Sequence, residues 1–394
     1  MRRTGVVVLA IVAAVWAHVP VRAADLRGTG DLGLVIERAT GSVQVIDVTA
    51  RESLGRIEGL GDLSHASAVF TPDQRYAFIF GRDGGLTKID LLTRSIVKRV
   101  VQGGNSIGGA ISDDGRLVAV SNYKPGGVRV FDAATLEMVA DIPAAFDGDG
   151  TRSKTVGLVD APGRRFVFTL YDAGEIWLAD FGSDLDPKIR RFKEIGALPY
   201  DALITGDGRH YIAGLFGEDG LAHIDLWQDP PTVQRILDGY GRGEEKLPVY
   251  KMPHLEGWAR AGDRFVLPAV GRHELLFVDA TTFKEAGRVA VHGQPVFAVA
   301  RPDGRQIWVN FAHPRNDTIQ VIDVPSQTII HSFKPGPAVM HLEFTSRGHE
   351  VWVSVRDSDR VDIYDTRTFE KRGSISVAKP SGIFFSARAH RIGL

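Results

Sequence analysis

The stretch GDLSHASAVFTPDQRYAFIFGRDGGLTKID, residues Gly61–Asp90, holds one copy of the unit from which this chain is built. An apolar strand, a polar turn at Pro72–Arg75, a second apolar strand, a glycine-rich turn and a strand ending in Asp90 follow one another. Asp and Gly at these positions supply the turn conformations that hairpins require. A more polar strand, SIVKRVV, comes next, so the unit predicts four antiparallel strands.

Short apolar strands that end in Asp recur along the chain at intervals of 42 to 54 residues. They end at Asp47, Asp90, Asp132, Asp180, Asp225, Asp279, Asp323 and Asp365. Strands with frequent turn signals and a period near 45 residues are typical of propellers with four strands per blade. We therefore predict an all-β fold, a single eight-bladed β-propeller with four-stranded blades.

The two ends of the array predict how the ring closes. The first copy, Leu32–Asp47, lacks an innermost strand, whereas the last segment, Ser381–Leu394, reads as an innermost strand with nothing after it. Pairing the two would remove both free edges, so we expect the C-terminal strand to complete blade 1. No linker interrupts the array, and residues 24–394 are predicted to form one domain.

Residues 1–23 read as a secretory signal peptide. Arg2 and Arg3 form a positive start, Val6–Trp16 is an apolar run too short to span a bilayer comfortably, and Val21–Ala23 offers small residues for cleavage. An uncleaved membrane anchor is the alternative interpretation. Cleavage would leave a soluble protein in the periplasm.

Composition excludes several kinds of site. Lys and Arg number 47 against 48 Asp and Glu, which gives no electrostatic reason to expect nucleic acid as a partner. The chain has no Cys, which excludes disulfides, thiolate metal sites and covalent haem c. Gly28–Gly33 matches G-x-G-x-x-G, but a strand rather than a helix is predicted after it, so we expect no NAD site.

The repeat also predicts which residues surround the mouth of the central channel. His65 lies ten positions before the turn residue Arg75, and the same offset in the other copies gives the residues that enter the innermost strands. These residues are Ser106, Lys154, Pro199, His254, Pro295, Val339 and, for the closing strand, Pro380.

His65 and His254 fall four blades apart in a ring of eight, so they are expected to face each other across the mouth. Two opposed imidazoles suit a flat metallated ring, with one coordinating the metal and the other donating protons or hydrogen bonds. Lys154 and Arg152, a quarter-turn away, suit carboxylates on the edge of such a ring. Two unrelated surface histidines are the alternative.

At these residues the chain is similar to the eight-bladed d1-haem domain of cytochrome cd1 nitrite reductase, and to free-standing relatives of that domain that act late in d1-haem biosynthesis. The resemblance runs from Leu32 to the C-terminus. It rests on His65 with Gly81–Asp83, Asn122–Pro125, Thr151–Arg152 with Thr155, His254–Trp258 and Arg347–Ser354.

The resemblance implies roles for individual residues. His65 takes the place of the proximal iron ligand of d1 haem, and His254 that of a distal histidine that protonates bound nitrite. Arg82, Tyr123 and Arg152 fall where the reductase contacts the macrocycle, with Lys124 in the same motif as Tyr123. We add Ser106 and Lys154 to these predicted cofactor contacts because both enter innermost strands.

Two departures argue against nitrite reduction. The second distal histidine of the reductase is unmatched, since Gly293–Val296 occupies that stretch and His292 is out of register. There is also no C-x-x-C-H motif to bring electrons. The resemblance thus implies binding of haem d1 or its dihydro-haem d1 precursor, with other maturation proteins and cytochrome cd1 nitrite reductase as partners.

Three functions stay open on this reading. The first is a late biosynthetic step such as side-chain dehydrogenation, with His254, Lys154, Tyr200 and Asp201 as acid/base candidates; these four are equally explained as ring-edge contacts or solvated loop residues. The second is a non-enzymatic carrier that hands the cofactor to the reductase. The third is a propeller scaffold without haem. The face of the ring opposite the haem offers a surface for a homodimer.

Overall fold

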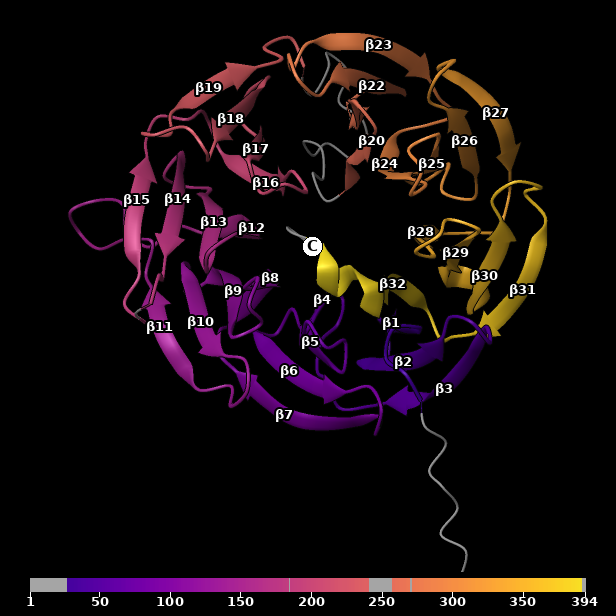
Figure 1. Cartoon of the computed structure of the whole chain (residues 1–394), viewed down its shortest axis with the longest axis horizontal. Helices are drawn as coiled ribbons and strands as arrows, with labels where there is room; N and C mark the ends of the chain where they lie inside the picture. The colour runs from indigo at the N-terminus through magenta and orange to yellow at the C-terminus, as the bar shows by residue number, and fades with distance from the viewer. Residues whose placement is uncertain (1–26, 184, 241–256, 270, 392–394) are drawn as a thin grey trace, which may run out of the picture.

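The computed structural model describes residues 27–183, 185–240, 257–269 and 271–391, which form eight four-stranded antiparallel sheets arranged as a ring (Figure 1). The predicted eight-bladed propeller is confirmed. The signal peptide predicted at residues 1–23 lies outside the described residues.

Within each blade the strands follow one another from the channel to the rim. The innermost strands are β32 (Pro380–Phe385), β4 (Ser67–Phe70), β8 (Asn105–Ile111), β12 (Thr155–Ala161), β16 (Pro199–Ile204), β20 (Ala259–Ala261), β24 (Pro295–Ala300) and β28 (Val339–Phe344). The second strands are β1 (Leu32–Glu37), β5 (Tyr76–Phe80), β9 (Leu117–Lys124), β13 (Arg165–Leu170), β17 (His210–Leu215), β21 (Arg264–Ala269), β25 (Gln306–Phe311) and β29 (Glu350–Val355).

The third strands are the ones predicted to end in Asp, and all eight do. They are β2 (Ser42–Asp47), β6 (Gly85–Asp90), β10 (Val128–Asp132), β14 (Glu175–Asp180), β18 (Leu221–Asp225), β22 (Glu274–Asp279), β26 (Ile319–Asp323) and β30 (Arg360–Asp365). The outer strands are β3 (Glu52–Ile57), β7 (Ser95–Val101), β11 (Met138–Ile142), β15 (Lys188–Phe192), β19 (Val233–Ile236), β23 (Glu285–Ala290), β27 (Thr328–Phe333) and β31 (Lys371–Ser376). Two short 3-10 helices, η2 (Arg356–Ser358) and η3 (Ser386–His390), complete the described elements.

The strand-ending Asp holds the turn that follows it. Asp90 Oδ1, for example, accepts the backbone N–H groups of Leu92 at 2.9 Å and Thr93 at 3.2 Å. Its other oxygen accepts Arg75 Nη2 at 2.8 Å, and Arg75 belongs to the turn before the second strand. One carboxylate therefore joins two successive turns of a blade, which explains why Arg and Asp recur together in the repeat.

Ring closure occurs where the sequence predicts it. β32 pairs with β1 in register Gly33 with Phe385 and Leu34 with Phe384, and Figure 1 shows the two strands side by side. A Cβ on Gly33 would lie 2.8 Å from Phe385 Cδ1, so only glycine permits this approach. Gly33, the last residue of the G-x-G-x-x-G match, lies in strand β1, so a strand and not a helix follows this motif.

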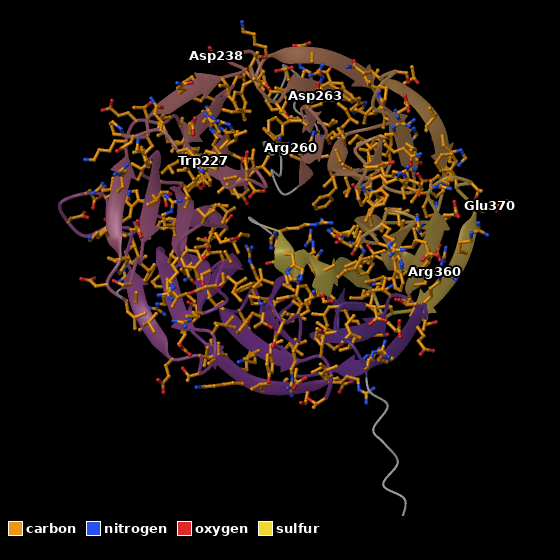
Figure 2. All side chains as sticks on the ribbon, viewed as in Figure 1. Trp227, Asp238, Arg260, Asp263, Arg360 and Glu370 are labelled. Carbon is orange, nitrogen blue, oxygen red and sulfur yellow. The ribbon has the colours of Figure 1, made fainter. Side chains whose placement is uncertain are left out.

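Apolar side chains from neighbouring blades fill the space between them. One such cluster contains Phe385, which is 4 % exposed. Its ring packs edge-on against the Trp352 ring, with 5.5 Å between the ring centroids. Side chains occupy the ring from its inner side, near Arg260, to its rim, at Glu370 (Figure 2). We name the two faces of the ring by the innermost strands: they begin at the entry face and end at the exit face.

Shortening Phe385 tests the closure. Phe385→Ala should lower the free energy of unfolding by about 3–5 kcal/mol, because it leaves a cavity between blades 8 and 1. Ile330→Ala is the control, because Ile330 on the outer strand β27 is 45 % exposed, and it should change stability by less than about 0.5 kcal/mol. Urea unfolding followed by tryptophan fluorescence would measure both; equal effects would contradict this account of closure.

Candidate functional site

The residues predicted to enter the innermost strands do so in the part of the chain that the structure describes. Pro199, Pro295, Val339 and Pro380 are the first residues of β16, β24, β28 and β32. Lys154 and Ser106 lie within one residue of the start of β12 and β8, and His65 precedes β4 by two residues. His254 lies outside the described residues. The repeat offset therefore locates the entry face correctly.

A bulge follows directly after the entry in several innermost strands. The pairing of β16 with β17 jumps from Pro199 to Ala202, and that of β28 with β29 jumps from Val339 to Leu342. β24 shows the same step from Pro295 to Ala298. The skipped residues leave the ladder next to the channel mouth, the place where bulges commonly re-aim side chains toward a site.

His65 lies at the entry face in the turn before β4, and its side chain is exposed. Asp62 shapes this turn, because its side chain accepts the Ser64 backbone N–H at 2.8 Å. Its backbone carbonyl accepts the Arg82 backbone N–H at 2.7 Å. One turn thus holds His65 and Arg82 at the same face.

Four aromatic side chains form a cluster beside Arg82, here called the aromatic cluster: Tyr123, Tyr171, Tyr200 and Phe216. The Arg82 guanidinium lies 5.4 Å from the Tyr123 ring centroid, and the Tyr123 hydroxyl donates to the Tyr200 hydroxyl at 2.7 Å. The Tyr200 ring lies 6.1 Å from Tyr171 and 5.9 Å from Phe216. The cluster therefore spans blades 3, 4 and 5.

Lys154 borders the aromatic cluster. Its ammonium lies 4.5 Å from the Tyr171 ring centroid and 2.6 Å from Asp172 Oδ1. The Arg82 guanidinium and the Lys154 ammonium thus each lie over the face of an aromatic ring, which attracts a positive charge. The structure brings together four of the predicted residues: Arg82, Tyr123, Lys154 and Tyr200.

The two hydrogen-bonded phenols are poor bases. Burial, together with the phenol–phenol hydrogen bond, raises the pKa of Tyr123, and burial raises the pKa of Tyr200. Both stay protonated at neutral pH, so neither can remove a proton from a ligand. Because the Tyr123 hydroxyl already donates to Tyr200, only the Tyr200 hydroxyl is left to donate a hydrogen bond to a ligand.

Other predicted residues have different surroundings. The Arg152 guanidinium pairs with Asp141 at 3.2 Å, and Lys124 is exposed at the end of β9. Ser106 is buried, and its hydroxyl donates to Asn122 Oδ1 at 2.9 Å. Asp201 is 8 % exposed, and its Oδ1 accepts the Ala202 backbone N–H at 3.0 Å. Ser106 and Asp201 are thus engaged within the protein.

His341 is a mouth residue that the sequence analysis did not select. It is one of the two residues skipped by the β28 bulge, and its ring lies 5.5 Å from Phe297 and 5.6 Å from Phe384. Its Nδ1 accepts the Ile383 backbone N–H at 3.2 Å, which assigns the proton of the neutral ring to Nε2. Burial lowers the pKa of His341 to about 3, so the ring is neutral at pH 7.

Tyr171 and Phe216 were also missed, although a signal for them exists. Each directly follows the second strand of its blade, as Tyr171 follows β13 and Phe216 follows β17. Second strands end at the entry face, so this position could have been read from the repeat. No comparable signal marks His341, because nothing in the sequence shows a bulge.

Comparison with known proteins gives this geometry a context. Residues 27–389 match the family model described as Cytochrome D1 heme domain. The chain belongs to the cytochrome D1 heme domain family. It is 61 % identical over 370 residues to Protein NirF of Pseudomonas aeruginosa, covering 94 % of each chain. It is 60 % identical to Protein NirF of Stutzerimonas stutzeri, covering 94 % of this chain and 95 % of the relative.

A solved structure extends the comparison. The structure titled dihydro-heme d1 dehydrogenase NirN in complex with DHE matches with a TM-score of 0.81 at 27 % identity. The match covers 93 % of this chain and 78 % of NirN. The resemblance to NirF proteins and to the d1-haem domain is thus confirmed. Among the described residues, no helix has the length and apolar character needed to cross a membrane.

Protonation of His341 should make stability depend on pH. The pKa of this residue is about 3 when folded and about 6.5 when unfolded, so the unfolded chain takes up the proton as pH falls through that window. Stability is therefore lost on acidification below pH 6.5, by at most about 1.4 kcal/mol per pH unit for this group.

The matched variants are His341→Gln, which keeps a hydrogen-bond acceptor, and His313→Gln at an exposed position. Urea unfolding between pH 7 and pH 4 should show a shallower loss of stability for His341→Gln than for the wild type, with His313→Gln unchanged. Identical slopes for all three proteins would show that His341 does not stay neutral in the folded protein.

Proposed function

We propose that this protein binds haem d1 or its dihydro-haem d1 precursor at the entry face, in the periplasm, and acts in a late step of haem d1 biosynthesis for nitrite reductase. The observation that carries the proposal is the convergence of His65, Arg82, Lys154 and the aromatic cluster at one mouth. The proposal also draws on the relatives: Protein NirF by sequence, and NirN, whose structure holds the dihydro ligand.

The residues present suit a flat, carboxylate-bearing macrocycle. His65 is exposed at the mouth and would supply a nitrogen ligand to the iron of the bound group. Arg82 and Lys154 would face carboxylates at its edge, and Tyr200 would contact its plane. Arg152 and Lys124 add positive charge on the same face, at the ends of neighbouring segments. His254 is proposed as the group on the opposite side of the ligand.

Two modes of action follow, with different chemical needs. Dehydrogenation of a propionate side chain requires a base beside it and an electron acceptor. The candidates in the described residues do not favour this, because Lys154 is paired with Asp172 and the pKa of the Tyr200 phenol is raised. A non-enzymatic carrier that delivers the cofactor to nitrite reductase needs only the iron ligand and the basic edge. The carrier is therefore kept as the alternative function, and turnover would depend on His254, which lies outside the described residues.

Titration with ferric haem d1 tests the iron ligand. The wild-type protein should give a low-spin absorption spectrum that His65→Ala abolishes, because alanine removes the imidazole nitrogen. His313→Ala, which removes an exposed histidine from the same face, should leave the spectrum unchanged. A normal low-spin spectrum from His65→Ala would refute His65 as the ligand.

Substituting His254, which is expected on the side of the ligand opposite His65, distinguishes an enzyme that alters the ligand from a carrier that only delivers it. If the ligand is chemically altered, His254→Ala should bind haem d1 within about threefold of wild type yet fail to restore nitrite respiration in a deletion strain, because imidazole is the proton donor suited to neutral pH. We expect this result. Full restoration by His254→Ala, at wild-type protein levels, would leave the carrier as the function.

A further inference from the structure

The exit face carries a cavity that the proposed function does not use. It has a volume of about 680 Å³ and lies between blades 8 and 1. Its walls come from the turn after β28, the turn after β30, the turn after β2 and the chain that flanks ring closure. All of these turns are at the ends of innermost or third strands, so the cavity opens on the face opposite His65.

The lining holds four arginines and three carboxylates. The positively charged lining residues are Arg51, Arg347, Arg367 and Arg372. The negatively charged ones are Asp31, Glu350 and Asp365, and His349 also lines the cavity. Arg51 is paired with Glu350, and Arg372 Nη2 with Asp365 Oδ2 at 2.9 Å. Two of the three acidic groups are therefore used by two of the four arginines, and the third, Asp31, lies 3.9 Å from Arg27.

Asp365 is engaged by groups other than the Arg367 guanidinium. Its Oδ1 accepts the backbone N–H groups of Arg367 at 2.8 Å and Thr368 at 2.9 Å. Within the described ranges, the guanidinium groups of Arg347 and Arg367 have no carboxylate partner. Each can therefore take a carboxylate of a ligand in the two-pronged geometry that guanidinium favours.

Apolar groups back the arginines. Leu32 is 1 % exposed and Phe385 4 %, and both line the cavity with Val48. The turn that carries Arg347 is held in place, because Thr366 Oγ1 donates to the Gly348 carbonyl at 2.6 Å. An apolar floor with a few polar anchors on a fixed frame is typical of small-molecule sites of this size.

We propose that this cavity is a second binding site, for an organic anion with an apolar body and at least two carboxylates, held by Arg347 and Arg367. Two guanidinium groups on separate turns select for separated carboxylates, and the apolar floor selects for a hydrocarbon body between them. A simple inorganic anion would pair with one arginine and make no contact with the apolar residues of the lining. The site is independent of the entry face, so it stands whether or not haem d1 is bound there.

Isothermal titration with trimesate, an aromatic tricarboxylate, tests this proposal on the full mature chain. We expect one trimesate per chain, with affinity that falls as salt rises, because the arginines lie at the cavity rim. Arg347→Gln and Arg367→Gln should each weaken binding by about tenfold, the effect of losing one charge-assisted pair. Arg305→Gln, which changes an exposed arginine of the corresponding turn in blade 7, should bind like wild type.

Two further arms make the result decisive. Benzoate and phosphate, titrated at equal ionic strength, should bind at least about tenfold more weakly than trimesate, because each engages one guanidinium. Thermal unfolding should match wild type for all three variants, which excludes misfolding as the cause of lost binding. The proposal fails if wild type does not bind trimesate, if Arg347→Gln and Arg367→Gln bind it normally, or if phosphate binds as tightly.

Discussion

The pairing of β32 with β1 is the constraint on which the rest of the molecule depends. It joins residues more than 300 positions apart in sequence, and it leaves neither end of the array with an open inner edge. Because the strands close into a ring, the distance between any two blades at the mouth is set by all the others. His65, Arg82 and the aromatic cluster thus keep their relative positions although they come from different blades, and no single blade could present them alone.

Inside each blade, hydrogen bonds of the Asp that ends the third strand act at short range. The carboxylate at the end of the third strand accepts N–H groups of the next turn, and in several blades it also pairs with a turn arginine. Arg209 with Asp225 and Arg264 with Asp279, both at 2.7 Å, repeat the arrangement of Arg75 with Asp90. These pairs are partly exposed, so each is worth little as an ion pair. Their value is geometric, because each joins two exit-face turns of its own blade.

The sequence predicts the ring well because its signals are local. An Asp at a strand end and a Pro-Asp-Gly turn act within a few residues, so blade number, strand order and the entries such as Lys154 and Pro199 could be read directly. Closure could be inferred because Leu32–Asp47 and Ser381–Leu394 are complementary fragments. The partners of side chains could not be read in this way. Arg152 was expected to face a ligand and pairs with Asp141 of β11, and Ser106 was expected at the mouth and donates to Asn122 of β9 in a buried network. Both depend on side-chain contacts that the repeat does not encode. His341 was missed for the same reason, since a bulge is a property of the pairing and not of one strand.

The bulges after the strand entries have a consequence for how such a site can change over evolution. Residues that the ladder skips, such as Tyr200 and His341, carry no pairing that sets the register of their blade. Substituting Tyr200 alters what the channel mouth presents without breaking a backbone ladder, whereas His341 is also held by the Ile383 backbone N–H of β32. Each blade with this bulge therefore contributes a pair of positions that can vary separately from the scaffold. Gly157, skipped in β12, marks the limit, because a Cβ there would lie 2.7 Å from the Cβ of Ala202 in the next blade. Each blade presents its own side chains at the shared channel mouth, so new chemistry can be introduced there one blade at a time.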